Sequence, residues 1–186
     1  LDIFDEEKVE IENDFTTNTF FSTRIVNGHS VEIPYPNNLI FVISHHFGSL
    51  NLGAYELWGI DQAIIRLGLD YGINERLAVS FGRSNYEKTY DSFFKYKILR
   101  QTENDKTPLT ATWFSGVYLK GIKWEIQDRD YLFLHRVSYV NQLLIARKFS
   151  EKLSVQLSPT WVHKNLVEKS KDFNDLFLLG VGSRVR

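Results

Sequence analysis

The sequence predicts an all-β protein: an antiparallel up-and-down transmembrane β-barrel of about 8–12 strands in the complete protein. Residues 64–72 and 76–84 form two predicted strands joined by a short charged turn. In both strands apolar side chains alternate with charged or small ones, so each strand has one apolar and one polar face. The polar face of the first strand carries Arg66 and Asp70, which cannot form an apolar core. Polar residues inside and apolar residues outside are the pattern of a barrel in lipid.

The same alternation predicts further strands at residues 38–47, 91–100, 109–119, 137–149, 153–164 and 175–185. In residues 91–100, Lys95 and Lys97 share one face. Burying two unpaired ammonium groups would cost much free energy in a dry core and little in a water-filled lumen. Residues 16–24 are expected to form a short strand or a segment inside the barrel. Pro159 cannot donate to a ladder, so we expect a bulge or a missing neighbour there.

Two turns of the sequence resemble each other. Residues 74–79 (NERLAV) are echoed by residues 150–155 (SEKLSV), and each turn leads directly into an alternating strand. Four predicted strands lie between the two turns, so both turns are expected at the same rim of the barrel. Short turns cluster at the periplasmic rim of such barrels, and longer loops at the outer rim.

Length and composition fit one domain with a short leading segment. Residues 1–14 are predicted to be an acidic N-terminal segment, and residues 15–186 the barrel domain. The final residues, 184–186, stop in mid-pattern, so we expect either that the complete protein continues or that the first and last strands meet in an unusual way. The expected export signal is not seen, so we take the chain to be a mature form.

Charge and residue usage exclude several classes of protein. The 22 Lys and Arg against 23 Asp and Glu give no basic face for a nucleic acid partner. The absence of Cys excludes disulfides and thiolate metal sites. The longest apolar run, residues 39–43, is too short for a transmembrane helix. Aromatic residues make up 15% of the chain, as expected where interfacial girdles are built.

Several motifs follow one another in a specific order and spacing. They include residues 22–30 (STRIVNGHS), 43–48 (ISHHFG), 59–61, 66–72, 82–84, 88–91, 95–101, 144–149 and 159–163. In these motifs the chain resembles a family of uncharacterised, porin-like bacterial outer-membrane β-barrel proteins, a domain of unknown function. The resemblance covers most of the chain, implies a barrel fold and a membrane location, and implies no reaction. Members of that family are longer at the C-terminus.

No set of residues predicts catalysis or a cofactor. His45 and His46 are adjacent on a predicted strand and point to opposite faces, so they cannot bind one metal together. Ser30 beside His29 has the wrong geometry for a nucleophile and its base on an extended strand. We therefore predict no enzyme activity, no metal and no cofactor.

The inward polar residues are the candidate functional set. The lumen-lining candidates are Arg66, Asp70, Lys95, Lys97, Gln142, Gln156, Lys164 and Arg184. They either form polar ladders that fill a narrow lumen, or line a pore and set its selectivity, in which case the excess of Lys and Arg favours anions.

The prediction from sequence is a protein of the Gram-negative outer membrane that contacts the lipid bilayer. Its expected role is transport as a small porin-like channel, or service as a structural or accessory subunit beside other outer-membrane or periplasmic subunits. The alternative is a barrel enzyme or a porin-like sheath for an electron-transfer partner. A soluble barrel with an apolar ligand is disfavoured, because it would need an apolar inner face.

Overall fold

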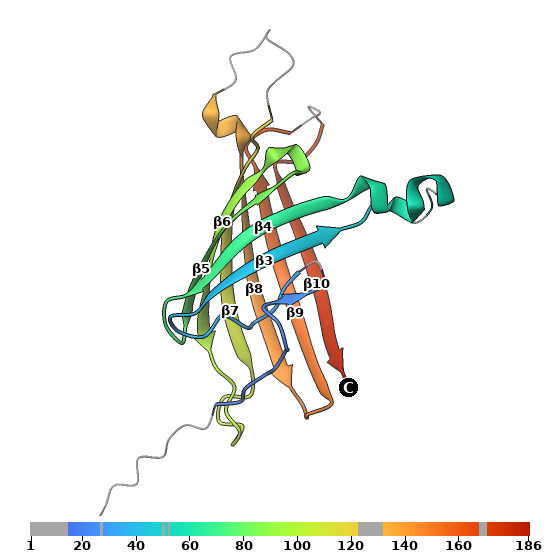
Figure 1. The fold of residues 1–186 in the computed structure, drawn as a ribbon. Helices are drawn as coiled ribbons and strands as arrows, with labels where there is room; N and C mark the ends of the chain where they lie inside the picture. Colours follow the sequence, from blue (N-terminus) through green and yellow to red (C-terminus); the bar gives the residue numbers. More distant parts are fainter. Residues whose placement is uncertain (1–14, 27, 50, 52, 123–131, 168–170) are drawn as a thin grey trace, which may run out of the picture.

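The computed structural model describes residues 15–26, 28–49, 51, 53–122, 132–167 and 171–186. Most of them form one curved antiparallel sheet (Figure 1). Its strands are β3 (Leu39–His46), β4 (Ile64–Gly72), β5 (Leu77–Ser84), β6 (Tyr90–Leu99), β7 (Thr110–Leu119), β8 (Val137–Lys148), β9 (Leu153–Lys164) and β10 (Asp175–Val185). Two further strands, β1 (Arg24–Ile25) and β2 (Gly28–His29), pair with each other.

Each strand of the large sheet pairs with the strand that follows it in sequence, in the order β10-β9-β8-β7-β6-β5-β4-β3. The predicted all-β, antiparallel up-and-down architecture is therefore confirmed. The sheet is not closed within the described residues: β3 and β10 are its edges and do not pair with each other. The unusual meeting of first and last strands, one of the two expectations, is not seen there.

The connections differ between the two rims. The turns after β4 and β8 lie at the same end of the sheet, as predicted, because four antiparallel strands separate them. In one turn, Asn74 Oδ1 accepts hydrogen bonds from the backbone N–H groups of Arg76 and Leu77, at 2.8 and 2.9 Å. In the other, Ser150 Oγ accepts from Lys152 and Leu153, at 3.2 and 3.1 Å. The two turns thus share one hydrogen-bonding plan, and we name their end the turn rim.

The opposite end, the loop rim, carries three connections that contain short 3₁₀ helices. These helices are η2 (Ala54–Gln62), η3 (Tyr86–Lys88) and η4 (Phe133–Arg136). The connection between β3 and β4 contains η2, which projects sideways from the sheet in Figure 1. The connection between β7 and β8 contains η4, directly before β8 begins.

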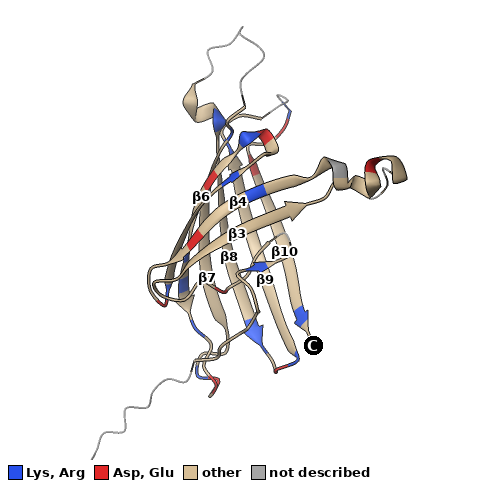
Figure 2. Cartoon of the chain, viewed as in Figure 1, with Lys and Arg blue, Asp and Glu red and all other residues tan. Residues whose placement is uncertain are grey.

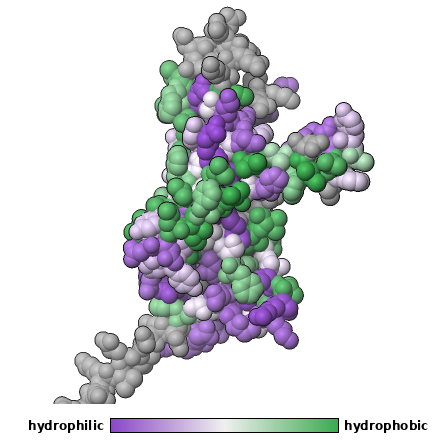
Figure 3. Space-filling model, in the orientation of Figure 1, coloured by the Kyte–Doolittle hydropathy of each residue, from purple (hydrophilic) through white to green (hydrophobic). Residues whose placement is uncertain are grey.

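The polarity of the sheet is inverted, as the alternation predicts. On β4, the outward Leu69 is 44% exposed, whereas the neighbouring Asp70 is 2% exposed. Lys95 on β6 and Gln156 on β9 are also buried. Charged residues consequently stand in the middle of strands as well as in the connections (Figure 2). In Figure 3, hydrophobic side chains gather across the middle of the visible face, over β3 and β4.

Residues 15–26 and 28–36, named here the inner segment, lie on the concave side of the sheet (blue in Figure 1). The expectation of an in-barrel segment is therefore confirmed. We name the large sheet, β3 to β10, the wall. Phe20 and Val31 of the inner segment are buried in an apolar cluster with side chains of this wall. The wall residues of this inner cluster are Phe93, Phe114, Leu144 and Ala146, with Ile25 and Val140 packed against it.

Two irregularities of the predicted strands have simple explanations. Val140 and Leu144 break the alternation of β8 because they face inward and pack in the inner cluster. Pro159 pairs in register with Leu179 of β10, while on its other side the β8–β9 pairing is interrupted between Gln142–Thr160 and Ile145–Leu157, without a register shift. The acidic segment, residues 1–14, lies outside the described residues.

Candidate functional site

The inner segment is held at its centre by one buried ammonium group. Lys95 is 1% exposed, and its Nζ donates hydrogen bonds to three backbone carbonyls of the inner segment. The acceptors are Thr23, Ser30 and Glu32, at 2.8, 2.9 and 3.0 Å. Three donors meet three acceptors, so the hydrogen-bonding capacity of the ammonium group is used in full.

Gln156 of β9 binds the same stretch. Its side-chain amide makes one accepting and one donating hydrogen bond, as the backbone of a neighbouring strand would. Its Oε1 accepts a hydrogen bond from the backbone N–H of Val31 at 2.9 Å, and its Nε2 donates to the carbonyl of His29 at 2.8 Å. Thr112 Oγ1 of β7 donates to the carbonyl of Val31 at 3.1 Å. Both backbone polar groups of the fully buried Val31 are thereby satisfied by side chains of the wall.

Nearer the turn rim, two basic side chains bind the first part of the inner segment. Arg184 of β10 donates from Nη1 to the carbonyl of Asn18 at 2.8 Å. Lys148 at the end of β8 donates to the carbonyl of Thr17 at 3.2 Å. Both hydrogen bonds are again made to backbone carbonyls of the inner segment.

Two ion pairs join side chains of the inner segment to the wall. Arg24 pairs with Asp70 of β4 at 3.0 Å, and Glu32 pairs with Lys97 of β6 at 3.5 Å. Asp70 also accepts a hydrogen bond from Ser80 Oγ of β5 at 2.5 Å. The carboxylate of Asp70 therefore has partners on both the inner segment and the wall.

A further ion pair lies within the wall. Arg66 of β4 crosses β5 and donates from Nε to Asp91 of β6 at 2.9 Å. Its guanidinium lies directly over Gly68 and Gly82, where an added Cβ would come within 2.3 Å of it at either position. The small residues beside the charged ones therefore leave room for this arginine to lie flat on the sheet.

His29 sits between two aromatic rings of the wall. Its ring centroid is 4.2 Å from that of Phe114, in a stacked arrangement, and 4.8 Å from that of Phe93, edge to face. Its Nδ1 is buried and has no hydrogen-bond partner in the described part of the chain. Burial lowers the pKa of His29 well below its usual range, and the cationic Lys95 and Arg24 lower it further.

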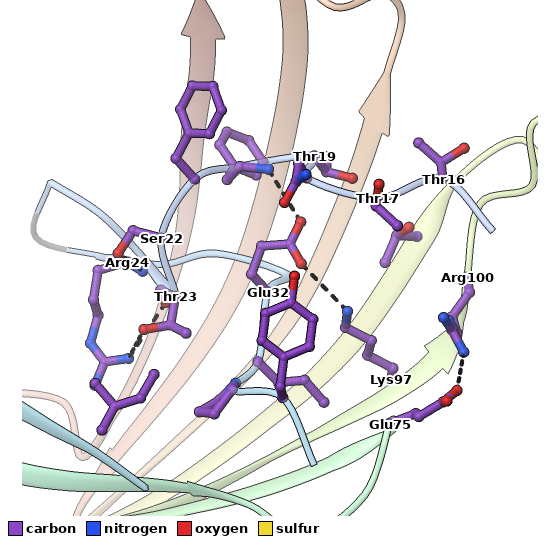
Figure 4. Close-up of a pocket in the computed structure, with 18 of the residues that line it drawn as sticks. Thr16, Thr17, Thr19, Ser22, Thr23, Arg24, Glu32, Glu75, Lys97 and Arg100 are labelled. Carbon is purple, nitrogen blue, oxygen red and sulfur yellow. Dashed lines mark hydrogen bonds and ion pairs between the residues drawn. The ribbon is translucent and has the colours of Figure 1, made fainter. Parts of the chain in front are cut away.

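The inner segment separates two cavities. The turn-side cavity, of about 460 Å³, is rich in hydroxyl groups from residues 16–23 and includes the Glu32–Lys97 and Glu75–Arg100 ion pairs (Figure 4). The loop-side cavity has a similar volume, about 460 Å³. It is lined by charged and aromatic side chains that include His29, His46, Arg66, Asp91 and Tyr118. Arg24 borders both cavities.

The structure brings most of the lumen-lining candidates to the inner segment. Those that contact it are Asp70, Lys95, Lys97, Gln156 and Arg184. Arg66 instead pairs within the wall, and Gln142 donates to Thr160 of the adjacent strand at 2.9 Å. Lys164 is exposed at the loop rim and lies apart from these contacts.

Sequence reasoning missed several members of the site. They are Arg24 and Glu32 of the inner segment, and Asp91 and Thr112 of the wall. A signal was present in the sequence: Phe93 and Phe114 occupy inward positions in phase with polar residues. Apolar side chains at inward positions indicate that a segment packs against them.

Two negative findings apply to the described residues. They contain no group of three or more His, Asp or Glu that could hold a metal ion. They also contain no helix that is long and apolar enough to cross a membrane.

Comparison with known proteins identifies the family. Residues 20–186 match the family described as a membrane bound beta barrel domain (DUF5777). Comparisons with curated proteins and with solved structures gave no match. The family description agrees with the inverted polarity of the sheet, and the match covers nearly the whole chain. The chain therefore belongs to this family of membrane-bound β-barrel domains.

Proposed function

We propose that this protein is an outer-membrane β-barrel that forms a narrow channel for small hydrophilic solutes. The observation that carries the proposal is a polar interior with a cavity of about 460 Å³ on each side of the inner segment. An apolar outer face with a hydrated, charged interior is the arrangement of channel-forming barrels. The inner segment sets the width of the passage.

An outer-membrane location follows from the same proposal. Barrels of this polarity with short turns at one rim and longer connections at the other are typical of the outer membrane, with the short turns on the periplasmic side. The turn rim would then face the periplasm and the loop rim the outside. No enzymatic step is part of the proposal.

The charges along the passage favour weak ion selectivity. The four basic residues that border the cavities in ion pairs are Arg24, Arg66, Lys97 and Arg100, and each has an acidic partner. Paired charges contribute little net field to a pore. A small neutral solute is consequently expected to pass as readily as a small ion of either sign.

Two measurements test the proposal. First, protein extracted in detergent should migrate differently on a gel before and after heating, as membrane barrels do. Recovery in the soluble fraction without detergent would overturn the membrane location. Second, folded protein in planar bilayers should show small single-channel conductance, and Lys97→Glu should shift its ion selectivity while Lys164→Glu should not.

A second candidate role is a structural or accessory subunit of an envelope complex. The observation that favours it is the inner segment, which occupies the middle of the lumen and buries Phe20 and Val31 there. Absence of conductance from folded, heat-modifiable protein would support this role and refute the channel. Co-purification from native membranes would then identify the other subunits.

A further inference from the structure

The contacts of the inner segment show an unusual preference for its backbone. Side chains of the wall make eight hydrogen bonds of 3.2 Å or less to its main chain, from Lys95, Thr112, Lys148, Gln156 and Arg184. The guanidinium of Arg184 also donates to the carbonyl of Glu151, in the turn between β8 and β9, at 3.1 Å. Main-chain groups are common to all peptides, so this recognition depends little on sequence.

The middle of the inner segment is also separate from the ladder of the sheet. In the described structure its backbone meets the sheet's backbone at its two ends: Thr16 donates to Gln101 at 2.9 Å, and Asn37, directly after the segment, donates to Gly72 at 2.7 Å. Between these points β1 and β2 pair with each other. The centre is therefore held by side chains of the wall and by packing.

Side-chain identity is constrained at one part of the inner segment and free at another. Thr19, Phe20, Ser30 and Val31 are buried and His29 stacks on Phe114, whereas Phe21 is 72% and Val26 is 91% exposed. The ion pairs of Arg24 and Glu32 add two further constraints. A different peptide with apolar residues at positions 20 and 31 and small residues at the buried positions 19 and 30 could make the same main-chain contacts.

We infer that the concave wall of the sheet is a binding site for an extended peptide strand, which the inner segment occupies as a separable ligand. Lys95, Thr112 and Gln156 form the centre of this site. The inference holds whether or not the barrel conducts, because it concerns how the wall recognises a peptide. Release of the occupant would also join the two cavities that the segment separates.

The test uses the full chain, with a protease recognition sequence inserted between Asn37 and Asn38. Both residues are exposed at the turn rim, where a protease can reach them. The protein is folded first and cut afterwards, so that folding takes place on the intact chain. The cut N-terminal piece should stay bound through gel filtration and should be released by excess synthetic peptide of residues 15–36. Immediate loss of the cut piece would show that the covalent connection holds it, and would overturn the inference.

Modified peptides distinguish backbone from side-chain recognition. A peptide N-methylated at Val31 cannot donate to Gln156 and should bind about tenfold more weakly. A peptide N-methylated at Phe21, whose N–H makes no hydrogen bond in the described structure, is the control and should bind within about threefold of the unmodified peptide. A peptide with Ala at Thr17 and Val26 should also bind within about threefold. Equal weakening by both N-methyl groups, or loss of binding with the Ala peptide, would refute backbone recognition.

Two substitutions in the wall test the binding site independently of the modified peptides. Gln156→Leu should weaken peptide binding about tenfold or more, because two hydrogen bonds to the peptide are lost. Gln142→Leu is the matched control, since Gln142 is also inward-facing but bonds to Thr160 of the sheet. Equal affinity of the two variants would contradict the proposed site. Heat-modifiable migration checks that each variant is folded, and the modified peptides decide the question if Gln156→Leu is not.

Discussion

A lysine that is 1% exposed must replace the water it loses with other hydrogen-bond acceptors, and Lys95 does so with three backbone carbonyls. The sequence correctly indicates an inward-facing cation at this position. It cannot indicate that the acceptors come from residues 23–32, more than sixty positions earlier in the chain. The role of Lys95 in this structure is to bind the inner segment rather than to face water.

Replacing Lys95 with Met should release the inner segment while leaving the sheet folded. The change removes three charge-assisted hydrogen bonds and leaves buried carbonyls unpaired, but it also removes the free-energy cost of burying a charge. On balance, the free energy with which the inner segment docks on the wall should fall by about 2–4 kcal/mol. Trypsin cleavage after Arg24 measures docking, and its rate should rise about 30-fold or more. Lys164→Met, which changes an exposed lysine at the loop rim, is the control. Equal cleavage of Lys95→Met and wild-type protein would refute this role.

His29 makes docking of the inner segment sensitive to pH. Since burial lowers its pKa, the docked segment holds His29 neutral, while the released segment has an ordinary histidine pKa near 6.5. Docking should therefore be strongest above about pH 6.5 and weaken as the pH falls below that value. Arg24 and Lys95, which also lie near the ring, oppose its protonation.

Hydrogen–deuterium exchange of residues 20–32 at pH 7.5 and 5.5 measures this effect. The matched protein is His29→Gln, which has no imidazole to titrate, and the protection of each amide is compared after correction for its intrinsic exchange rate at each pH. Protection should fall at the lower pH in the wild type beyond any fall in His29→Gln. The same pH dependence in both proteins would assign the effect to groups other than His29 and would refute this prediction.

At the scale of elements, strands that face lipid on one side and water on the other are readable from sequence. The period-two alternation placed β4, β5, β6, β9 and β10 within a residue or so of their observed bounds. The inner and outer faces of β8 were harder to assign from the sequence, because Val140 and Leu144 face inward and are apolar. The inner segment has no such period, since its residues meet six different strands through individual contacts. Its position inside the sheet could be raised as one expectation, but its contacts could not be predicted.

The Arg66–Asp91 ion pair depends on two glycines of β4 and β5. Gly82→Val would place a side chain within the space that the Arg66 guanidinium occupies, and should separate it from Asp91. We expect a loss of about 1–3 kcal/mol in the free energy of unfolding, from overpacking and the broken pair. Urea unfolding in lipid vesicles, followed by tryptophan fluorescence, gives this value.

The control for that substitution is Gly180→Val on β10. An added Cβ there would meet Ser158 at an ordinary 3.4 Å, so the same change of residue should cost less. A double change, Gly82→Val with Arg66→Ala, should recover part of the loss if the clash with Arg66 is its cause. No recovery would place the cost elsewhere in the sheet.

At the scale of the whole molecule, the two edges of the open sheet expose backbone groups that must be hydrogen-bonded inside a membrane. The outer edges of β3 and β10 have no strand partner among the described residues. Hydrocarbon offers no hydrogen bonds to backbone groups, so both edges must be paired where they cross the bilayer. The outward side chains of these edge strands, such as Phe41, Phe177 and Val181, are apolar and exposed, which is consistent with lipid contact.

Depth in the bilayer gives the sharpest test of that contact. Leu69 lies on the outer face near the middle of β4, and Leu153 begins β9 beside the turn rim; they are 44% and 39% exposed. Leu69→Arg should lower the free energy of unfolding from vesicles by about 2–4 kcal/mol, whereas Leu153→Arg should lower it by about 0–1 kcal/mol. In water, two leucines of similar exposure would tolerate arginine about equally. Equal, small effects in urea titrations would therefore show that this face does not contact hydrocarbon, whereas a clear difference would place the middle of the sheet inside the bilayer.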